Sequence, residues 1–153
     1  DGWLRRARAL AEKTIDFTGF MDRVVLDSDV TLPIRQNVKQ DMIVTYHDSC
    51  QSCVSLGLRS EARRVIQDVL KLELHEMPQS DVCCGFGGSF SIEHGDVAEY
   101  VLDKKLGNAE STGANILVSD NPGCLMHLRG GVDVRGRKMR VLHLAQLIEE
   151  CLE

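Results

Sequence analysis

Hydrophobic residues follow a helical period at the start of the chain. Between residues 3 and 25 they recur every three or four positions, which predicts one amphipathic helix interrupted near Gly19. Residues 27–40 are polar, contain Pro33 and follow no period, so a linker is expected there. A leading amphipathic helix and linker over residues 1–40 therefore precede the rest of the chain.

From residue 41 onward, short β-rich runs alternate with stretches of helical period. Strands are predicted at residues 42–46, 72–77, 116–118 and 139–142, and helices at residues 59–70, 92–109, 125–128 and 145–152. This alternation is typical of an α/β fold whose parallel strands are joined by right-handed crossovers. We predict a domain over residues 41–153 with a four-stranded, mostly parallel sheet flanked by helices.

Composition narrows the classes of function. With 153 residues the chain can bury a core of its own, and 43% hydrophobic and 27% charged residues are ordinary for a globular protein. A net charge of −5 and only 5% aromatic residues argue against nucleic acid as a partner. We find no transmembrane segment and no signal peptide in the sequence. We therefore expect a cytoplasmic protein, which would reach the inner membrane only through partners.

Six cysteines are the unusual feature, and reduced thiols are expected without a signal peptide. Cys50 follows the first predicted strand, Cys83 and Cys84 follow the second, and Cys124 follows the third. Because the carboxyl ends of parallel strands share one edge of a sheet, these four thiols should converge there. They are the predicted ligands of a metal centre. Cys151 has the spacing of a core residue in the last helix.

The segments around these cysteines fit such a centre. Gly85, Gly87 and Gly88 allow the backbone to approach a bulky group and supply N–H donors to sulfur. The run lacks the pattern of a phosphate-binding loop. Cys124 lies at a predicted helix N-terminus, where the helix dipole favours the thiolate.

Three further residues are candidates for the same centre. Cys53 forms a CxxC pair with Cys50, although a small buried apolar role is about as compatible with its position. His127 follows Cys124 by one helical turn and could be a ligand or an outer hydrogen-bonding group. His47 ends the first strand, where a supporting role is expected and a ligand role stays open.

The motifs His47–Cys50, Cys83–Gly88 and Gly123–Leu128 together resemble the cysteine-rich CCG domain family. They are most similar to its lactate-utilisation protein A and glycolate oxidase iron–sulfur subunit branch, which is related to the cysteine-rich subunit of heterodisulfide reductase. The leading helix looks like the link between two tandem repeats. The resemblance therefore implies a second repeat only, with the first CCG repeat as a missing partner.

The resemblance implies an iron–sulfur protein that transfers electrons in a complex oxidising a 2-hydroxy acid such as lactate or glycolate. Its other subunits would then be partners. Cys50, Cys83, Cys84 and Cys124 match the cysteines of the family, whereas His127 replaces the second cysteine of a frequent final CxxC. Four thiolates suffice for a [4Fe-4S] cluster, which purification in air can remove.

Two alternatives stay open. Four sulfurs, or three sulfurs and His127, also suit tetrahedral zinc, which would make the domain a structural scaffold for subunit assembly. A metal-free thiol–disulfide module, in which Cys50 and Cys53 cycle, is the other. We find no general base, nucleophile elbow or nucleotide-binding pattern, so this chain alone is not expected to turn over a hydroxy acid.

Overall fold

The structure, a computed structural model, describes residues 2–26, 28, 30–35 and 41–153. Its centre is one parallel sheet with the strand order β2-β1-β3-β4. The strands are β1 (Ile43–Tyr46), β2 (Glu73–Leu74), β3 (Ile116–Ser119) and β4 (Arg140–His143). The predicted four-stranded α/β fold is confirmed, although the second strand is shorter than expected because only two of its residues pair with β1.

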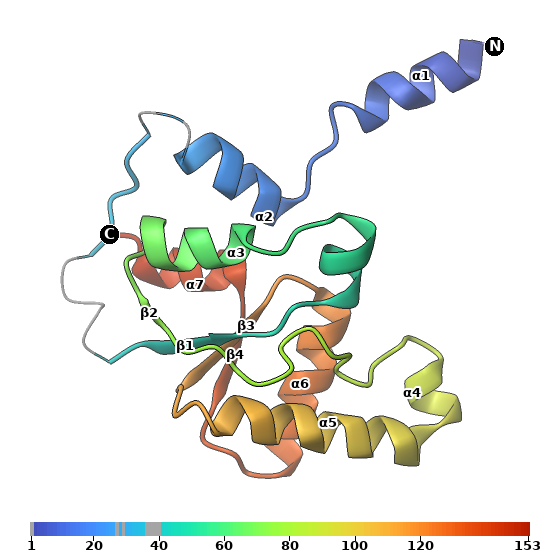
Figure 1. The fold of residues 1–153 in the computed structure, drawn as a ribbon, viewed down its shortest axis with the longest axis vertical. Helices are drawn as coiled ribbons and strands as arrows, with labels where there is room; N and C mark the ends of the chain where they lie inside the picture. The colour runs from blue at the N-terminus through green and yellow to red at the C-terminus, as the bar shows by residue number, and fades with distance from the viewer. Residues whose placement is uncertain (1, 27, 29, 36–40) are drawn as a thin grey trace.

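Helices cover both faces of the sheet (Figure 1). Two of them continue into wide π-type turns, α2 at Met21–Leu26 and α3 at Val65–Val69, and a further turn of this kind spans Gln51–Ser55. The helices are α1 (Gly2–Ala11), α2 (Phe17–Phe20), α3 (Glu61–Arg64), α4 (Phe90–Glu93), α5 (Gly95–Glu110), α6 (Pro122–Val134) and α7 (Leu144–Cys151).

Two hydrophobic cores form because successive strand residues point to opposite faces. Ile116 and Val118 of β3 pack with residues of α3 and α7, whereas Leu117 between them packs with residues of α5 and α6. Burial on both faces explains why β3 is hydrophobic at three successive positions instead of alternating. Cys151 is fully buried in the first core, as its helical spacing indicated.

The N-terminal helix breaks earlier than predicted. α1 ends at Ala11, and α2 begins after Asp16, whose carboxylate accepts the backbone N–H groups of Thr18 and Gly19. The expected interruption at Gly19 is therefore wrong, because the capping side chain of Asp16 starts a new helix that includes Gly19. α1 projects away from the body, and every residue the structure describes in it is exposed, including Trp3 at 75% (Figure 1).

α6 is much longer than the predicted helix at residues 125–128. It passes through Gly131, where an added Cβ would lie 2.8 Å from the Leu102 side chain and 2.9 Å from that of Leu106. Gly131 therefore permits close packing of α6 on α5. Half of the predicted linker at residues 27–40 lies outside the described residues, and Ile34 within it forms an isolated antiparallel bridge with Leu152. No helix in the described part of the chain is both long and apolar enough to cross a membrane.

Candidate metal centre

The candidate site lies where the strand order reverses direction. The chain places β2 on one side of β1 and β3 on the other. Parallel α/β sheets bind ligands outside the carboxyl ends of the strands at such a switch point. Residues 47–50 follow β1 and residues 120–124 follow β3, so both segments flank this position, and the loop after β2 reaches the same edge.

Two buried cysteines and a buried histidine meet at this edge. The sulfurs of Cys84 and Cys124 and a ring nitrogen of His47 all lie within 4.8 Å of one another. All three residues are buried, and His47 is fully shielded from solvent. Thiolates and imidazole are the donors that zinc and iron centres use, so the chemistry of this group fits a metal.

The hydrogen bonding of His47 leaves one nitrogen available. Its Nδ1 lies 3.1 Å from the carbonyl oxygen of Ser80. A carbonyl oxygen only accepts hydrogen bonds, so Nδ1 is the donor in this contact. Among the described residues, Nε2 is buried without a hydrogen-bond partner. A buried ring nitrogen that lies next to two thiols and has no hydrogen bond among the described residues is suited to a metal.

A hydrogen bond between Cys84 and Cys124 shifts their pKa values in opposite directions. A hydrogen bond with Cys124 lowers the pKa of Cys84; burial opposes this effect, and the His47 ring and the Phe86 N–H add to it. The same hydrogen bond and burial raise the pKa of Cys124. Of the two thiols, Cys84 is therefore the one that ionises more readily to the thiolate form that binds metals.

The glycine-rich loop directs backbone N–H groups at these sulfurs. Gly85 donates to Cys83 over 3.3 Å, and Phe86 donates to Cys84. Gly85 has a φ of 95°, and an added Cβ would lie 2.6 Å from the carbonyl oxygen of Ala98 in α5. Only glycine satisfies both conditions. Gly87 and Gly88 also have positive φ angles, which turn the loop tightly beside the cysteines.

The other two predicted thiols lie at the exposed rim of the site. Cys50 and Cys83 are exposed and stand outside the compact group of His47, Cys84 and Cys124. Partial burial raises the pKa of Cys83, and the charges of Cys84 and Cys50 raise it further. Cys50 and Cys83 also raise the pKa of Cys124. The four thiols from three separate loops are thus near enough to interact electrostatically.

Cys124 lies in the first turn of α6. Asn121 caps this helix by accepting the Cys124 N–H at 3.1 Å, and Pro122 occupies the first helical position. His127 lies one turn further on, where its ring packs against Phe86 with 6.0 Å between centroids. The structure does not bring His127 into the compact group, although its Nε2 is also buried and unpartnered among the described residues.

Cys53 faces another cavity. This cavity of about 320 Å³ is lined by Cys53 together with Asp48, Arg59 and Arg63, among others. Burial raises the pKa of Cys53 to about 11, and Asp48 contributes to the rise. Such a thiol is protonated at neutral pH and is a poor nucleophile. This environment disfavours thiol exchange between Cys50 and Cys53.

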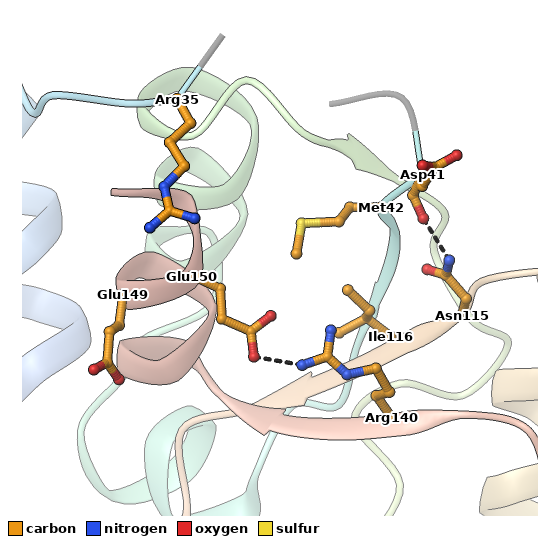
Figure 2. Close-up of a pocket in the computed structure, with 8 residues that line it drawn as sticks. All are labelled: Arg35, Asp41, Met42, Asn115, Ile116, Arg140, Glu149 and Glu150. Carbon is orange, nitrogen blue, oxygen red and sulfur yellow. Dashed lines mark hydrogen bonds and ion pairs between the residues drawn. The ribbon is translucent and has the colours of Figure 1, made fainter. Parts of the chain in front are cut away.

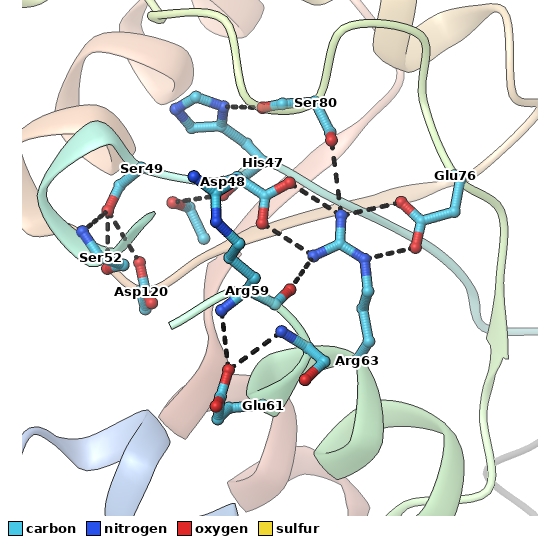
Figure 3. Close-up of polar contacts among 12 residues, drawn as sticks. His47, Asp48, Ser49, Ser52, Arg59, Glu61, Arg63, Glu76, Ser80 and Asp120 are labelled. Atoms are coloured by element: carbon cyan, nitrogen blue, oxygen red, sulfur yellow. Dashed lines mark hydrogen bonds and ion pairs between the residues drawn. The ribbon is translucent and has the colours of Figure 1, made fainter. Parts of the chain in front are cut away.

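An ion-pair network next to the site was not predicted from the sequence (Figure 3). Arg63 donates to both Asp48 oxygens at 2.8 Å and to both Glu76 oxygens at 2.6 and 3.0 Å. Burial would raise the pKa of Asp48, but hydrogen bonds from Arg63 and Ser80 outweigh it and lower that pKa. The network joins three separate segments, so no spacing in the sequence could reveal it.

Lys105 is a second residue that sequence reasoning missed. It lies on α5 and is only 2% exposed. Its ammonium group donates to the carbonyl oxygens of Gln79 at 2.5 Å and Ser80 at 3.1 Å. Helical periodicity gave no signal, because a lysine at a core-facing position cannot be distinguished from one that extends to solvent.

A larger hollow of about 740 Å³ lies at the opposite edge of the sheet (Figure 2). It borders the beginnings of β3 and β4, at Ile116 and Arg140, and Arg140 pairs there with Glu150 of α7. Its lining includes no cysteine or histidine among the described residues. The thiol chemistry therefore belongs to the carboxyl edge and not to this hollow.

Comparison with known proteins agrees with the geometry. The sequence model of the CCG cysteine-rich domain family matches residues 44–129, which include every loop that carries the site. The chain therefore belongs to this family of cysteine-rich domains.

Similar proteins place the chain within the family. It is 34% identical to lactate utilization protein A of Lysinibacillus sphaericus over 146 residues, which are 95% of this chain and 61% of that protein. The corresponding protein of Geobacillus kaustophilus is 34% identical, and that of Bacillus subtilis 32%; in each, the match covers 95% of this chain and 59% of the relative. The chain thus spans about three fifths of the length of these relatives.

Proposed function

We propose that this chain is an iron–sulfur electron-transfer domain of a lactate-utilisation system. Cys50, Cys83, Cys84 and Cys124 would bind a [4Fe-4S] cluster at the switch point of the sheet. The observation that carries the proposal is the buried Cys84–Cys124 pair, which lies next to a glycine-rich loop whose N–H groups meet sulfur. Such a cluster supplies one-electron transfer, and N–H donors to sulfur tune its potential.

The proposed setting is a cytoplasmic complex in which a partner oxidises a 2-hydroxy acid and passes electrons to this domain. The names of the relatives support lactate as the substrate of the whole system. A first CCG repeat is the second proposed partner. The exposed apolar side chains of α1, among them Trp3, Leu4 and Leu10, are consistent with a surface that such a repeat covers.

The test is metal and sulfide analysis after anaerobic reconstitution with iron and sulfide. We expect a brown protein with about four irons and four sulfides per chain. Cys84→Ser and Cys124→Ser should lose the cluster. Cys151→Ala removes another buried thiol from the opposite core and should keep it. A colourless protein that takes up no iron under these conditions would refute the proposal.

A second candidate is a structural zinc site. The compact group of His47, Cys84 and Cys124 favours it, because three such ligands with a fourth donor form a tetrahedral zinc site. It predicts about one zinc per chain, no visible absorption and loss of stability with a chelator. Elemental analysis of the same anaerobic preparations distinguishes the two centres.

A further inference from the structure

We infer that His47 is a nitrogen ligand of the metal centre and that Lys105 is the positioning residue that holds its ring in place. The inference rests on the proposed function in one respect, since it requires that the thiols bind a metal. It goes further by assigning a donor other than sulfur. A [4Fe-4S] cluster has four terminal ligand positions, so His47 would take the position otherwise given to one of the exposed thiols, Cys50 or Cys83. The inference also explains a buried lysine.

The histidines of the chain differ in their free nitrogens. Both ring nitrogens of His75 are engaged, with Thr112 and Glu73, and so are both of His143. His47 and His127 each keep a buried Nε2 without a partner among the described residues. Of these two, only His47 belongs to the compact group with the buried thiols. His47 is therefore the histidine whose free nitrogen is placed to join them.

The carbonyl group of Ser80 sets the orientation of this ring. It accepts hydrogen bonds from His47 Nδ1, from the Asp48 backbone N–H and from Lys105 Nζ, each at 3.1 Å. Metal-binding histidines usually donate their second ring N–H to such an acceptor, which determines the tautomer and aligns the ligating nitrogen. The Ser80 carbonyl has this role for His47.

Lys105 stabilises the loop that presents this carbonyl. The preceding residue, Gln79, has a φ of 55°, an unfavourable conformation for a residue with a side chain. Such strain persists where surrounding contacts enforce it. The hydrogen bond of Lys105 to the Gln79 carbonyl is one of these contacts, and its bond to Ser80 is another. Without the ammonium group, the loop and the His47 ring would lose their shared anchor.

The direct test is pulsed electron paramagnetic resonance on protein labelled with ¹⁵N only in histidine. One sample is reconstituted with iron and sulfide and then reduced. A parallel sample of the metal-free protein is loaded with Co²⁺. Histidine labelling excludes signals from backbone nitrogens. We expect a ¹⁵N coupling in the unmodified chain that persists in His127→Gln and disappears in His47→Gln. A chain that binds metal without any histidine coupling overturns the inference alone. A chain that binds neither centre overturns the proposed function as well.

The role of Lys105 is tested with Lys105→Met, which retains a long apolar side chain but no charge. We expect Co²⁺ affinity about 10- to 100-fold weaker, the range typical when an outer hydrogen-bonding partner of a metal ligand is lost. Lys104→Met, at the exposed neighbouring position, is the matched control and should bind as the unmodified chain does. Equal affinity for both variants would overturn the positioning role.

Discussion

Replacing Gly85 by alanine tests the architecture of the cysteine loop. Gly85 has a φ of 95°, and a residue with a Cβ there loses about 1–2 kcal/mol from backbone strain. The added Cβ would also lie 2.6 Å from the Ala98 carbonyl oxygen, a backbone atom of α5 that cannot rotate away. Overpacking of this kind costs about 1–3 kcal/mol. We expect Gly85→Ala to lower the free energy of unfolding by about 2–5 kcal/mol, which is the sum of the two effects.

Two other glycines separate these effects. Gly88 has a φ of 63° and open space around its Cα, so Gly88→Ala should show the strain alone, about 1–2 kcal/mol. Gly107 lies within α5, also in open space, so Gly107→Ala should stabilise the chain by up to about 1 kcal/mol.

The assay is urea denaturation followed by circular dichroism, performed on the metal-free proteins. If Gly85→Ala and Gly88→Ala were equally destabilising, the close approach of the loop to α5 would be incorrect. An increase in stability for Gly85→Ala would refute the assigned backbone conformation as well.

Two further predictions concern the ion-pair network. Arg63→Met leaves the buried Asp48 carboxylate without its main partner and should lower the free energy of unfolding by about 3 kcal/mol in urea denaturation. The control Arg59→Met should have little effect. Similar losses of stability for both variants would contradict the assigned pairing. Because the folded state lowers the pKa of Asp48, its ionised form stabilises the fold above the unfolded pKa of about 4, and this contribution is lost as the pH falls through the folded value. The stability difference between the unmodified chain and Asp48→Asn should therefore be constant from pH 7 to 5 and shrink below about pH 4 in denaturation series, and a difference that is undiminished at pH 3 would contradict it.

Much of the fold could be predicted because local patterns carry it. The alternation of apolar strands and helical periods was sufficient to predict the four-stranded sheet, and the cysteines follow three strands whose ends share one edge. The prediction failed where tertiary contacts outweigh local preference. α6 continues through Gly130 and Gly131 because α5 packs closely against it, which no local pattern indicates.

The sequence predicted which segments carry the candidate site, but not which of its residues are buried. The sequence placed four thiols and His47 near one edge, yet it could not distinguish the buried Cys84 and Cys124 from the exposed Cys50 and Cys83. Burial at a loop depends on which helix packs over it, and that is a property of the whole fold.

Hydrophobic periodicity is a local property, so the order of strands and helices, and with it the edge of the sheet at which the cysteine loops emerge, could be read from the amino-acid order alone. Three contacts could not: the approach of His47 to two buried thiols, the pairing of Arg63 with Asp48, and the burial of Lys105 beneath the cysteine loop. These contacts join residues far apart in the chain, and their strength depends on distances and burial that exist only after the helices have packed on the sheet.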